Sequence, residues 1–350
     1  MNSVIDPSHL SHFISASIGP FPLQLEKLKG DASDRHYWRA RENGKSWILS
    51  WTPDEKAFDS FLKIQNHLAS LQVPVPSILA RDKGKKLMLL EDCGNLTFEA
   101  CVKKTPQMKE RLYDTALALL IRMQRDPSAR SFTFVQDDLR SPLDDCKKPS
   151  LHSFSADFFL QELKKTYDYL FQKMLHIRFS AHEERSLWSS FKIICHQMMK
   201  FPLVFTHRDY HSRNILLPSM PLGEKEFKII DFQDARLGPI TYDLCSLLHD
   251  CYVDLEDSFI DQYLSKYFEL SPIAPKIFSS EKEFRHIYWI STVQRVLKAA
   301  GTFAYLVLEK KKENYQNFLR PAYQRAHQAL DQLKELKELK KILGFLEGNS

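Results

Sequence analysis

The first ninety residues alternate between short apolar runs and turn signals, a pattern typical of β-strands. Asn43-Gly44 is a strong hairpin signal, because both residues tolerate a positive φ. The predicted strands are 25–28, 36–40, 47–51, 78–81 and 87–90. Apolar residues at helical spacing predict one helix over 54–71, which the Val-Pro-Val-Pro run at 73–76 ends. The predicted order is therefore three strands, a helix and two strands.

The rest of the chain has the pattern of a mainly helical region. No glycine occurs from residue 95 to residue 222, and most of that stretch has apolar residues at helical spacing. The predicted helices are 109–124, 156–175 and 182–200, and β-prone segments interrupt them at 203–205, 215–217 and 227–230. The helical pattern returns after Asp243. Four leucines spaced by three predict one terminal helix over 322–345, docked on the body with its charged face in water.

The change of pattern near Gly94 predicts two lobes that pack without a flexible linker. We expect a small, sheet-rich lobe over 1–92 and a larger, mainly helical lobe over 93–350, with a hinge near 91–94. The predicted fold class is therefore α+β. A composition of 43% hydrophobic and 27% charged residues is that of an ordinary globular chain, which excludes a disordered or low-complexity protein.

Charge and cysteine content narrow the function classes. Lys and Arg number 49 against 44 Asp and Glu, a net charge of +5, which is too mild for the dense basic stripe of a nucleic-acid binder. None of the six cysteines forms a CxxC motif, so we expect reduced thiols. No apolar run has the length of a membrane span, and the first residues lack the pattern of a secretory signal. We expect a cytoplasmic monomer that acts on a small molecule, with no nucleic-acid or membrane partner.

Two polar strings, each flanked by apolar strand-like residues, carry the candidate chemistry. The string 205–217 contains His207, Asp209 and Asn214 at the spacing H-x-D-x₄-N, and the string 228–238 contains Asp231 after an apolar run. Phosphoryl transfer requires a carboxylate that accepts a hydroxyl proton, and an amide oxygen plus a second carboxylate that hold Mg²⁺. These residue types at these spacings therefore point to phosphoryl transfer.

The two strings together resemble the aminoglycoside phosphotransferase family, a relative of the protein kinases, whose core pattern is HxDxxxxN followed by an I-I-D-[FW] strand end. This resemblance implies a bilobal protein-kinase-like fold, with a small antiparallel-sheet N-lobe that has one helix and a larger C-lobe with a helical substrate subdomain. Longer strings resemble one subgroup, the anomeric kinases of N-acetylmuramate and N-acetylglucosamine, which make sugar 1-phosphates in peptidoglycan recycling. These strings are 30–35, 89–92, 231–244 and 294–303.

The resemblance assigns roles to individual residues of the two strings. It makes 205–217 a catalytic loop with Asp209 as the base, and 228–238 a metal loop with Asp231. Asn214 and Asp231 match the family's Mg²⁺ ligands, and ATP is the implied phosphoryl donor. We interpret His207 as a brace of the catalytic loop, and Asp243 as a residue that either caps the next helix or anchors this loop.

The nucleotide is expected to lie against the turn 30–35 and the hinge. The candidate residues are Gly30, Ser33 and Arg35 for the phosphates, and Glu91 and Cys93 for backbone contacts to adenine. Protein kinases carry a lysine on the third strand that pairs with the phosphates, but here Ser50 or Trp51 occupies that place. The subgroup also lacks this lysine, which leaves Arg35 or Lys56 as the compensating cation.

Candidates for the acceptor lie in or near the two strings. They are His211, Arg213, Gln233, Asp234 and Arg236, together with Arg295 and Lys298 on a later helix. A lactyl carboxylate such as that of N-acetylmuramate calls for an Arg or Lys partner, as Arg295 and Lys298 would provide. Two alternatives stay open at this point. One is a kinase of another acceptor, such as an aminoglycoside, choline or homoserine, and the other is a pseudokinase that binds nucleotide without catalysis.

Overall fold

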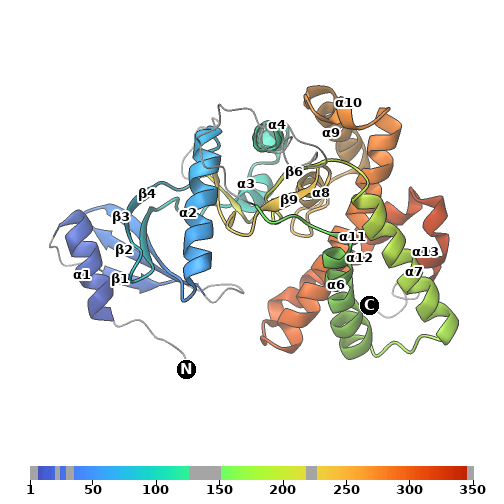
Figure 1. Ribbon diagram of the computed structural model, residues 1–350, viewed down its shortest axis with the longest axis horizontal. Helices are drawn as coiled ribbons and strands as arrows, with labels where there is room; N and C mark the ends of the chain where they lie inside the picture. Colours follow the sequence, from blue (N-terminus) through green and yellow to red (C-terminus); the bar gives the residue numbers. More distant parts are fainter. Residues whose placement is uncertain (1–6, 20–23, 29–34, 126–150, 218–226, 345–350) are drawn as a thin grey trace, which may run out of the picture. The chain divides into compact units, whose positions relative to one another are not determined.

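The computed structural model describes residues 7–19, 24–28, 35–125, 151–217 and 227–344. The chain divides by compactness into two units, which are drawn in Figure 1. The first unit is Met1–Thr97 with Ile215–Asp234, and the second is Phe98–Asn214 with Ala235–Ser350. Residues 215–234 thus belong to the first unit, although both flanking segments belong to the second. This division does not follow the lobe boundary expected at residue 92, and that boundary stays a prediction.

The first unit is built on a five-stranded antiparallel sheet in the order β1-β2-β3-β5-β4. Its strands are β1 (Gln24–Lys27), β2 (His36–Glu42), β3 (Lys45–Trp51), β4 (Ile78–Asp82) and β5 (Leu87–Glu91). Asn43 and Gly44 join β2 to β3 with positive φ values of 45° and 75°. The five predicted strands and the predicted hairpin are confirmed.

Helices cover both faces of this sheet (Figure 1). On one face, α1 (Pro7–Ile18) packs Leu10, Phe13 and Ile14 against apolar side chains of β3 and β5. On the other lies α2 (Glu55–Ser70), whose apolar stripe is buried. Successive side chains of a strand point to opposite faces, and so Met88 is buried as completely as Leu89. The expectation of one helix here is therefore wrong: the spacing of Leu10, Phe13 and Ile14 was the signal for α1.

The second unit is helical, and α11 (Glu281–Leu308) is its central helix (Figure 1). Around it pack α6 (Ala156–Thr166), α7 (Ala181–Met198), α8 (Tyr242–Leu248) and α12 (Leu319–Asp331). Gly301 lets α11 approach α6 closely, because a Cβ at this position would lie 2.5 Å from the Cα of Thr166. The hydroxyl of Thr166 also donates to the Leu297 carbonyl at 2.8 Å. This close approach brings polar residues of α6 and α11 together.

The other elements complete the two units. Within the described residues, the remaining α-helices are α3 (Phe98–Lys104), α4 (Lys109–Gln124), α9 (Asp257–Leu270), α10 (Ala274–Ile277) and α13 (Lys337–Gly344). A π-helical segment, Tyr167–Met174, extends α6, and 3₁₀ turns cover Pro106–Met108, Glu313–Phe318 and Lys334–Leu336. In the second unit β6 (Leu203–Thr206) pairs with β9 (Arg236–Pro239), and in the first unit β7 (Ile215–Leu216) pairs with β8 (Lys228–Ile229). None of the helices within the described ranges combines the length and apolar character that a membrane crossing requires.

The single terminal helix predicted over 322–345 is wrong. The chain instead forms α12, a 3₁₀ turn and α13. Residues three apart move steadily around an α-helix, so four leucines at that spacing cannot share one face. A 3₁₀ turn has three residues per turn, and the interruption allows all four leucines to be buried. These are Leu330, Leu333, Leu336 and Leu339.

Candidate active site

The loop after β6 is held in place by Asp243, a buried residue in the first turn of α8. Its carboxylate accepts hydrogen bonds from the backbone N–H groups of His207, at 2.6 Å, and Arg208, at 3.0 Å. Arg208 has a φ of 82°, so the turn adopts a conformation that L-residues rarely take and that neighbouring contacts must support. Burial raises the pKa of Asp243 to about 7, although the two N–H donors act to lower it. Asp243 therefore anchors the loop that leads to Asp209.

The backbone of Asp209 is fixed from both sides. Its N–H donates to Nδ1 of the buried His207 ring at 3.3 Å. Its carbonyl accepts from the side-chain amide of Asn214 and from the backbone N–H of His211, both at 2.9 Å. Both backbone groups of Asp209 are thus engaged within the loop, which fixes the position of its Cα.

Two cations from α11 surround the Asp209 carboxylate. Lys298 Nζ lies 3.2 Å and Arg295 Nη2 lies 3.7 Å from Asp209 Oδ1. The two cations are three residues apart and therefore share one face of the helix. Burial acts to raise the pKa of Asp209, but the charges of Lys298, Arg295 and Arg208 outweigh it and hold the pKa well below its usual range. The carboxylate is thus ionised near neutral pH, and 30% of the side chain is exposed.

Glu162 on α6 adds a second carboxylate to this cluster. It accepts from Arg208 Nη2 at 3.3 Å and from Gln294 Nε2 of α11 at 3.1 Å. Lys165 lies one turn further along α6. Burial lowers the pKa of its ammonium group, and the nearby positive charges of Lys298 and Arg208 lower it further. Sequence reasoning did not identify Glu162 or Lys165. Both lie on a helix that is far from either polar string along the chain.

His211 and Arg213 have different surroundings. His211 Nε2 lies 3.4 Å from Asn214 Nδ2, and burial lowers the pKa of the imidazole, so the ring is neutral near pH 7. Arg213 Nε donates to Glu99 of α3 at 2.7 Å, and its guanidinium lies 3.7 Å from the centre of the Tyr252 ring. His211 therefore belongs to the group around Asp209, whereas these contacts direct Arg213 toward α3.

The first unit contains the other candidate carboxylate, that of Asp231. Asp231 follows β8, is exposed, and has a φ of 64°. Gln233 Nε2 donates to its Oδ1 at 2.6 Å. Burial raises the pKa of the Tyr37 hydroxyl in β2, while the Arg35 cation lowers it and the Asp231 charge raises it further. The Arg35 side chain therefore contacts Tyr37, and Asp231 lies near enough for its charge to act on the same hydroxyl.

The segment 91–95, where the hinge is predicted, is fixed to the sheet by an ion pair that sequence reasoning missed. Arg39 Nε in β2 lies 2.6 Å from Asp92 Oδ2, and both side chains are buried. Arg39 also donates to Asn95 Oδ1 at 2.8 Å. The neighbouring Glu91 carboxylate lies 2.8 Å from Lys228 Nζ, and burial raises the pKa of the Cys93 thiol to about 12. The side chains of Asp92 and Glu91 are therefore engaged in structural ion pairs.

The predicted site residues thus fall into two groups. Asp209, Asn214, His211, Arg295 and Lys298 come together in the second unit, and Asp231 and Arg35 do so in the first. Asp234 is exposed at the end of the first unit, and Gly30 and Ser33 lie outside the described residues. In β3 the centre carries no lysine, and Ser50 is buried.

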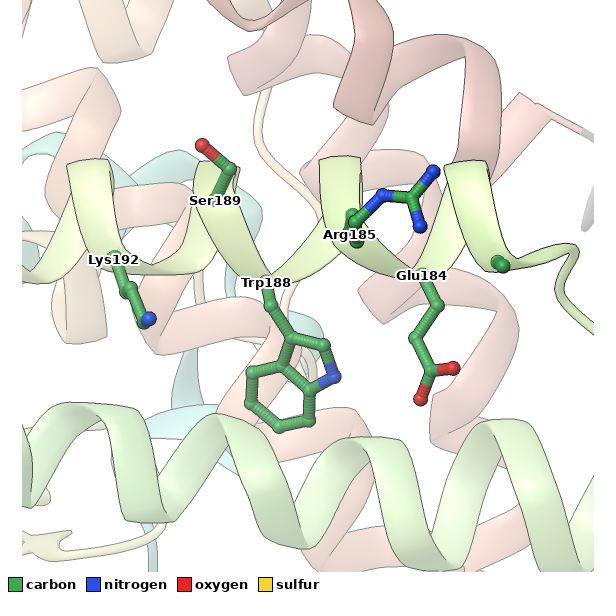
Figure 2. A pocket seen from close by; sticks show the side chains of 6 residues that line it. Glu184, Arg185, Trp188, Ser189 and Lys192 are labelled. Carbon is green, nitrogen blue, oxygen red and sulfur yellow. The ribbon is translucent and has the colours of Figure 1, made fainter.

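A hollow of about 500 Å³ on α7 is separate from these residues (Figure 2). Glu184, Trp188 and Lys192 contribute to its lining, and Trp188 packs edge to face on the buried Phe191. No candidate residue from either polar string lines it. The hollow is a feature of the α7 surface and takes no part in the site around Asp209.

Comparisons with known proteins give a family and a fold. The phosphotransferase enzyme family matches residues 24–276, well over half of the chain. The N-acetylmuramate/N-acetylglucosamine kinase of Neisseria meningitidis serogroup B is 28% identical over 311 residues, which cover 84% of each chain.

Solved structures share the fold at low identity. A putative aminoglycoside phosphotransferase from Ralstonia eutropha has a TM-score of 0.58 at 14% identity, over 94% of this chain and 98% of that one. An ADP-bound aminoglycoside phosphotransferase has a TM-score of 0.56 at 15% identity, over 92% of this chain and 98% of that one. The expected α+β, protein-kinase-like fold with two lobes is confirmed.

Proposed function

Because this chain belongs to the phosphotransferase enzyme family and is a small-molecule kinase, we propose that it transfers phosphate from ATP to the anomeric hydroxyl of an amino sugar. The acceptor is N-acetylmuramate or N-acetylglucosamine, and the product is the sugar 1-phosphate of peptidoglycan recycling. The relative from Neisseria meningitidis, named for these two sugars and matched over most of its length, supports this acceptor. That the enzyme works as a cytoplasmic monomer stays a prediction.

The observation that carries the proposal is the ionised Asp209 carboxylate on a braced loop, beside Lys298 and Arg295. Asp209 would accept the proton of the sugar's C1 hydroxyl. At the same time the hydroxyl oxygen would bond to the γ-phosphorus of ATP, and the bond from that phosphorus to the leaving ADP oxygen would break. A carboxylate with a low pKa is a weak base, and an anomeric hydroxyl is more acidic than an ordinary alcohol. The transition state is loose, so positioning and charge neutralisation matter more than base strength.

Asn214 and Asp231 are the proposed Mg²⁺ ligands, since both offer the hard oxygen atoms that this ion prefers. The Asn214 amide nitrogen is engaged by the Asp209 carbonyl, so its oxygen is the atom left for a ligand role. Asp231 is exposed at the end of β8. When bound, Mg²⁺ neutralises charge on the transferring phosphates.

Arg35 is the proposed replacement for the third-strand lysine. It lies beside Asp231 and Tyr37, whereas Lys56 is exposed in the first turn of α2. We propose the turn with Gly30 and Ser33 for the phosphates, and the backbone of Glu91 and Cys93 for adenine. One structural neighbour, an aminoglycoside phosphotransferase, was solved with ADP bound, which is consistent with ATP as the phosphoryl donor.

The charges around Asp209 oppose a cationic acceptor. An aminoglycoside or choline would bring its positive charge toward Lys298 and Arg295, which already share one carboxylate. Like charges at such distances repel, and more strongly in a half-buried site than in water. An uncharged or acidic sugar fits these surroundings better.

The test uses purified protein with ATP, Mg²⁺ and either sugar. Phosphorus NMR should show a product signal coupled to the anomeric proton. A product phosphorylated on C6 would overturn the anomeric assignment and keep the kinase. Brisk turnover on an aminoglycoside or an amino alcohol, with none on either sugar, would overturn the acceptor.

A further inference from the structure

The side chains around Asp209 carry more positive charge than their carboxylates neutralise. We define the basic cluster as Arg208, Lys165, Arg295 and Lys298. Two carboxylates contact these cations directly: Glu162 binds Arg208, and Asp209 is shared by Arg295 and Lys298. The buried Asp243 carboxyl, whose charge also acts on Asp209 and Arg295, is the third acidic group here, so four cations face three carboxyl groups in one part of the second unit.

Such a surplus is costly where side chains are withdrawn from water. The exposed fractions are 10% for the Arg295 side chain and 13% for that of Lys298. A desolvated cation without its own counter-ion is unfavourable, and buried charges are normally paired. We therefore expect a further anion to join the cluster when the site is in use.

Of the two cations beside Asp209, Lys298 is the one better suited to bind that anion. Arg295 Nε donates to Ser246 Oγ at 2.9 Å, which fixes its guanidinium against α8. The Lys298 ammonium has three donor hydrogens at the end of a flexible stem, and one of them is directed to Asp209. Lys298 can therefore contact the base and an incoming anion together.

We propose that Lys298 binds the carboxylate of an acidic acceptor sugar and thereby favours N-acetylmuramate over N-acetylglucosamine. This inference rests on the proposed function. The two sugars differ by the lactyl ether on O3, which gives N-acetylmuramate its carboxylate. A contact between this carboxylate and the ammonium that already touches Asp209 would place the acceptor beside the base. The other possible anion is the γ-phosphate of ATP, and the experiment separates the two.

The experiment compares Lys298→Met with wild type on three acceptors: N-acetylmuramate, its neutral carboxamide, and N-acetylglucosamine. For wild type, kcat/KM should be higher for the acid than for the carboxamide. In the variant, the preference for the acid should fall roughly 10–100-fold, the value of a hydrogen bond to a charged group. Lys282→Met, the same change at an exposed position of α11, should keep the preference. Lys298→Arg, which retains the charge, should restore much of it.

Three outcomes would contradict the inference. An equal loss of kcat/KM on all three acceptors in Lys298→Met would mean that Lys298 acts through Asp209 alone. If Lys298→Met had a higher KM for ATP but kept the wild-type preference for N-acetylmuramate over its carboxamide, the bound anion would be the γ-phosphate. Wild-type protein inactive on every sugar would overturn the proposed function, and the inference with it. If Lys298→Met does not fold, the wild-type comparison of acid with carboxamide and the Lys298→Arg variant still decide the matter.

Discussion

Lys298 Nζ lies 3.2 Å from Asp209 Oδ1, although the two residues are 89 positions apart in the chain. The candidate base is therefore completed by α11, a helix outside both polar strings. Helix packing, and Gly301 in particular, decides whether this contact forms, because α11 must approach α6 closely to bring its cations to the loop. The surroundings of Asp209 and the packing of the second unit are thus linked through one helix.

Asp209→Asn should abolish phosphoryl transfer while nucleotide still binds. Loss of a positioned general base typically lowers the rate by roughly 10²–10⁴-fold. The measurement is steady-state turnover, with nucleotide affinity determined separately by calorimetry. Asp168→Asn, the same change on the exposed surface of the second unit, is the control. Comparable turnover in Asp209→Asn and wild type would remove Asp209 from the mechanism.

Asp231→Ala should lose the Mg²⁺-dependent part of nucleotide binding, since the Asp231 carboxylate would hold the ion that neutralises charge on the phosphates. ATP affinity measured across a Mg²⁺ titration should become nearly flat. Asp234→Ala, three residues along and also exposed, should keep the wild-type response. An unchanged titration in Asp231→Ala would disprove the metal role.

Arg39→Met should destabilise the first unit, because it leaves Asp92 buried without its cation. Breaking a buried ion pair by removing one partner costs roughly 3–5 kcal/mol. Arg41→Met is the matched control on the same strand: Arg41 lies 2.6 Å from Glu26, but both side chains are exposed, and such pairs contribute little. Urea unfolding of both variants gives the comparison. Similar losses of unfolding free energy in Arg39→Met and Arg41→Met would show that the buried ion pair contributes no more to stability than the exposed one.

Gly301→Ala should destabilise the second unit by about 1–3 kcal/mol, the usual cost of overpacking a core. The added Cβ would meet the Thr166 backbone at 2.5 Å, a contact that a side-chain rotation cannot relieve. Gly344→Ala adds the same methyl group in α13, where nothing lies within 4 Å, and should be neutral or stabilising. Thermal unfolding distinguishes the two, and an unaffected Gly301→Ala would contradict the close approach of α6 and α11.

The stability difference between wild type and Asp243→Asn should depend on pH. Folding raises the pKa of Asp243 to about 7 from an ordinary value near 4, so the folded state favours the protonated form. This contribution to stability is fully present below about pH 4 and is lost as the pH rises through 7. Wild type should therefore lose stability relative to the variant between these values. A difference in unfolding free energy that stays constant from pH 4 to pH 8 would contradict the raised pKa.

The sequence alone predicted the described strands other than β9, the four helices α2, α4, α6 and α7, the helical character of the region after Asp243, and the residues of both polar strings. Strand alternation and helical spacing are local, and the H-x-D-x₄-N spacing places its residues on one loop whatever surrounds it. The spacing of the terminal leucines was equally visible. The chain buries these leucines by interrupting the helix with a 3₁₀ turn. That interruption depends on the surface against which they pack.

Only the tertiary structure decided which side chains surround Asp209 and which one pairs with Asp92. α11 is buried around most of its circumference, so its periodicity does not indicate which face carries the cations beside Asp209. The pairing of Glu162 with Arg208, and of Arg39 with Asp92, joins segments 46 and 53 residues apart. Charges paired over such separations are brought together by the packing of whole helices and strands, and no local pattern in the chain specifies their partners.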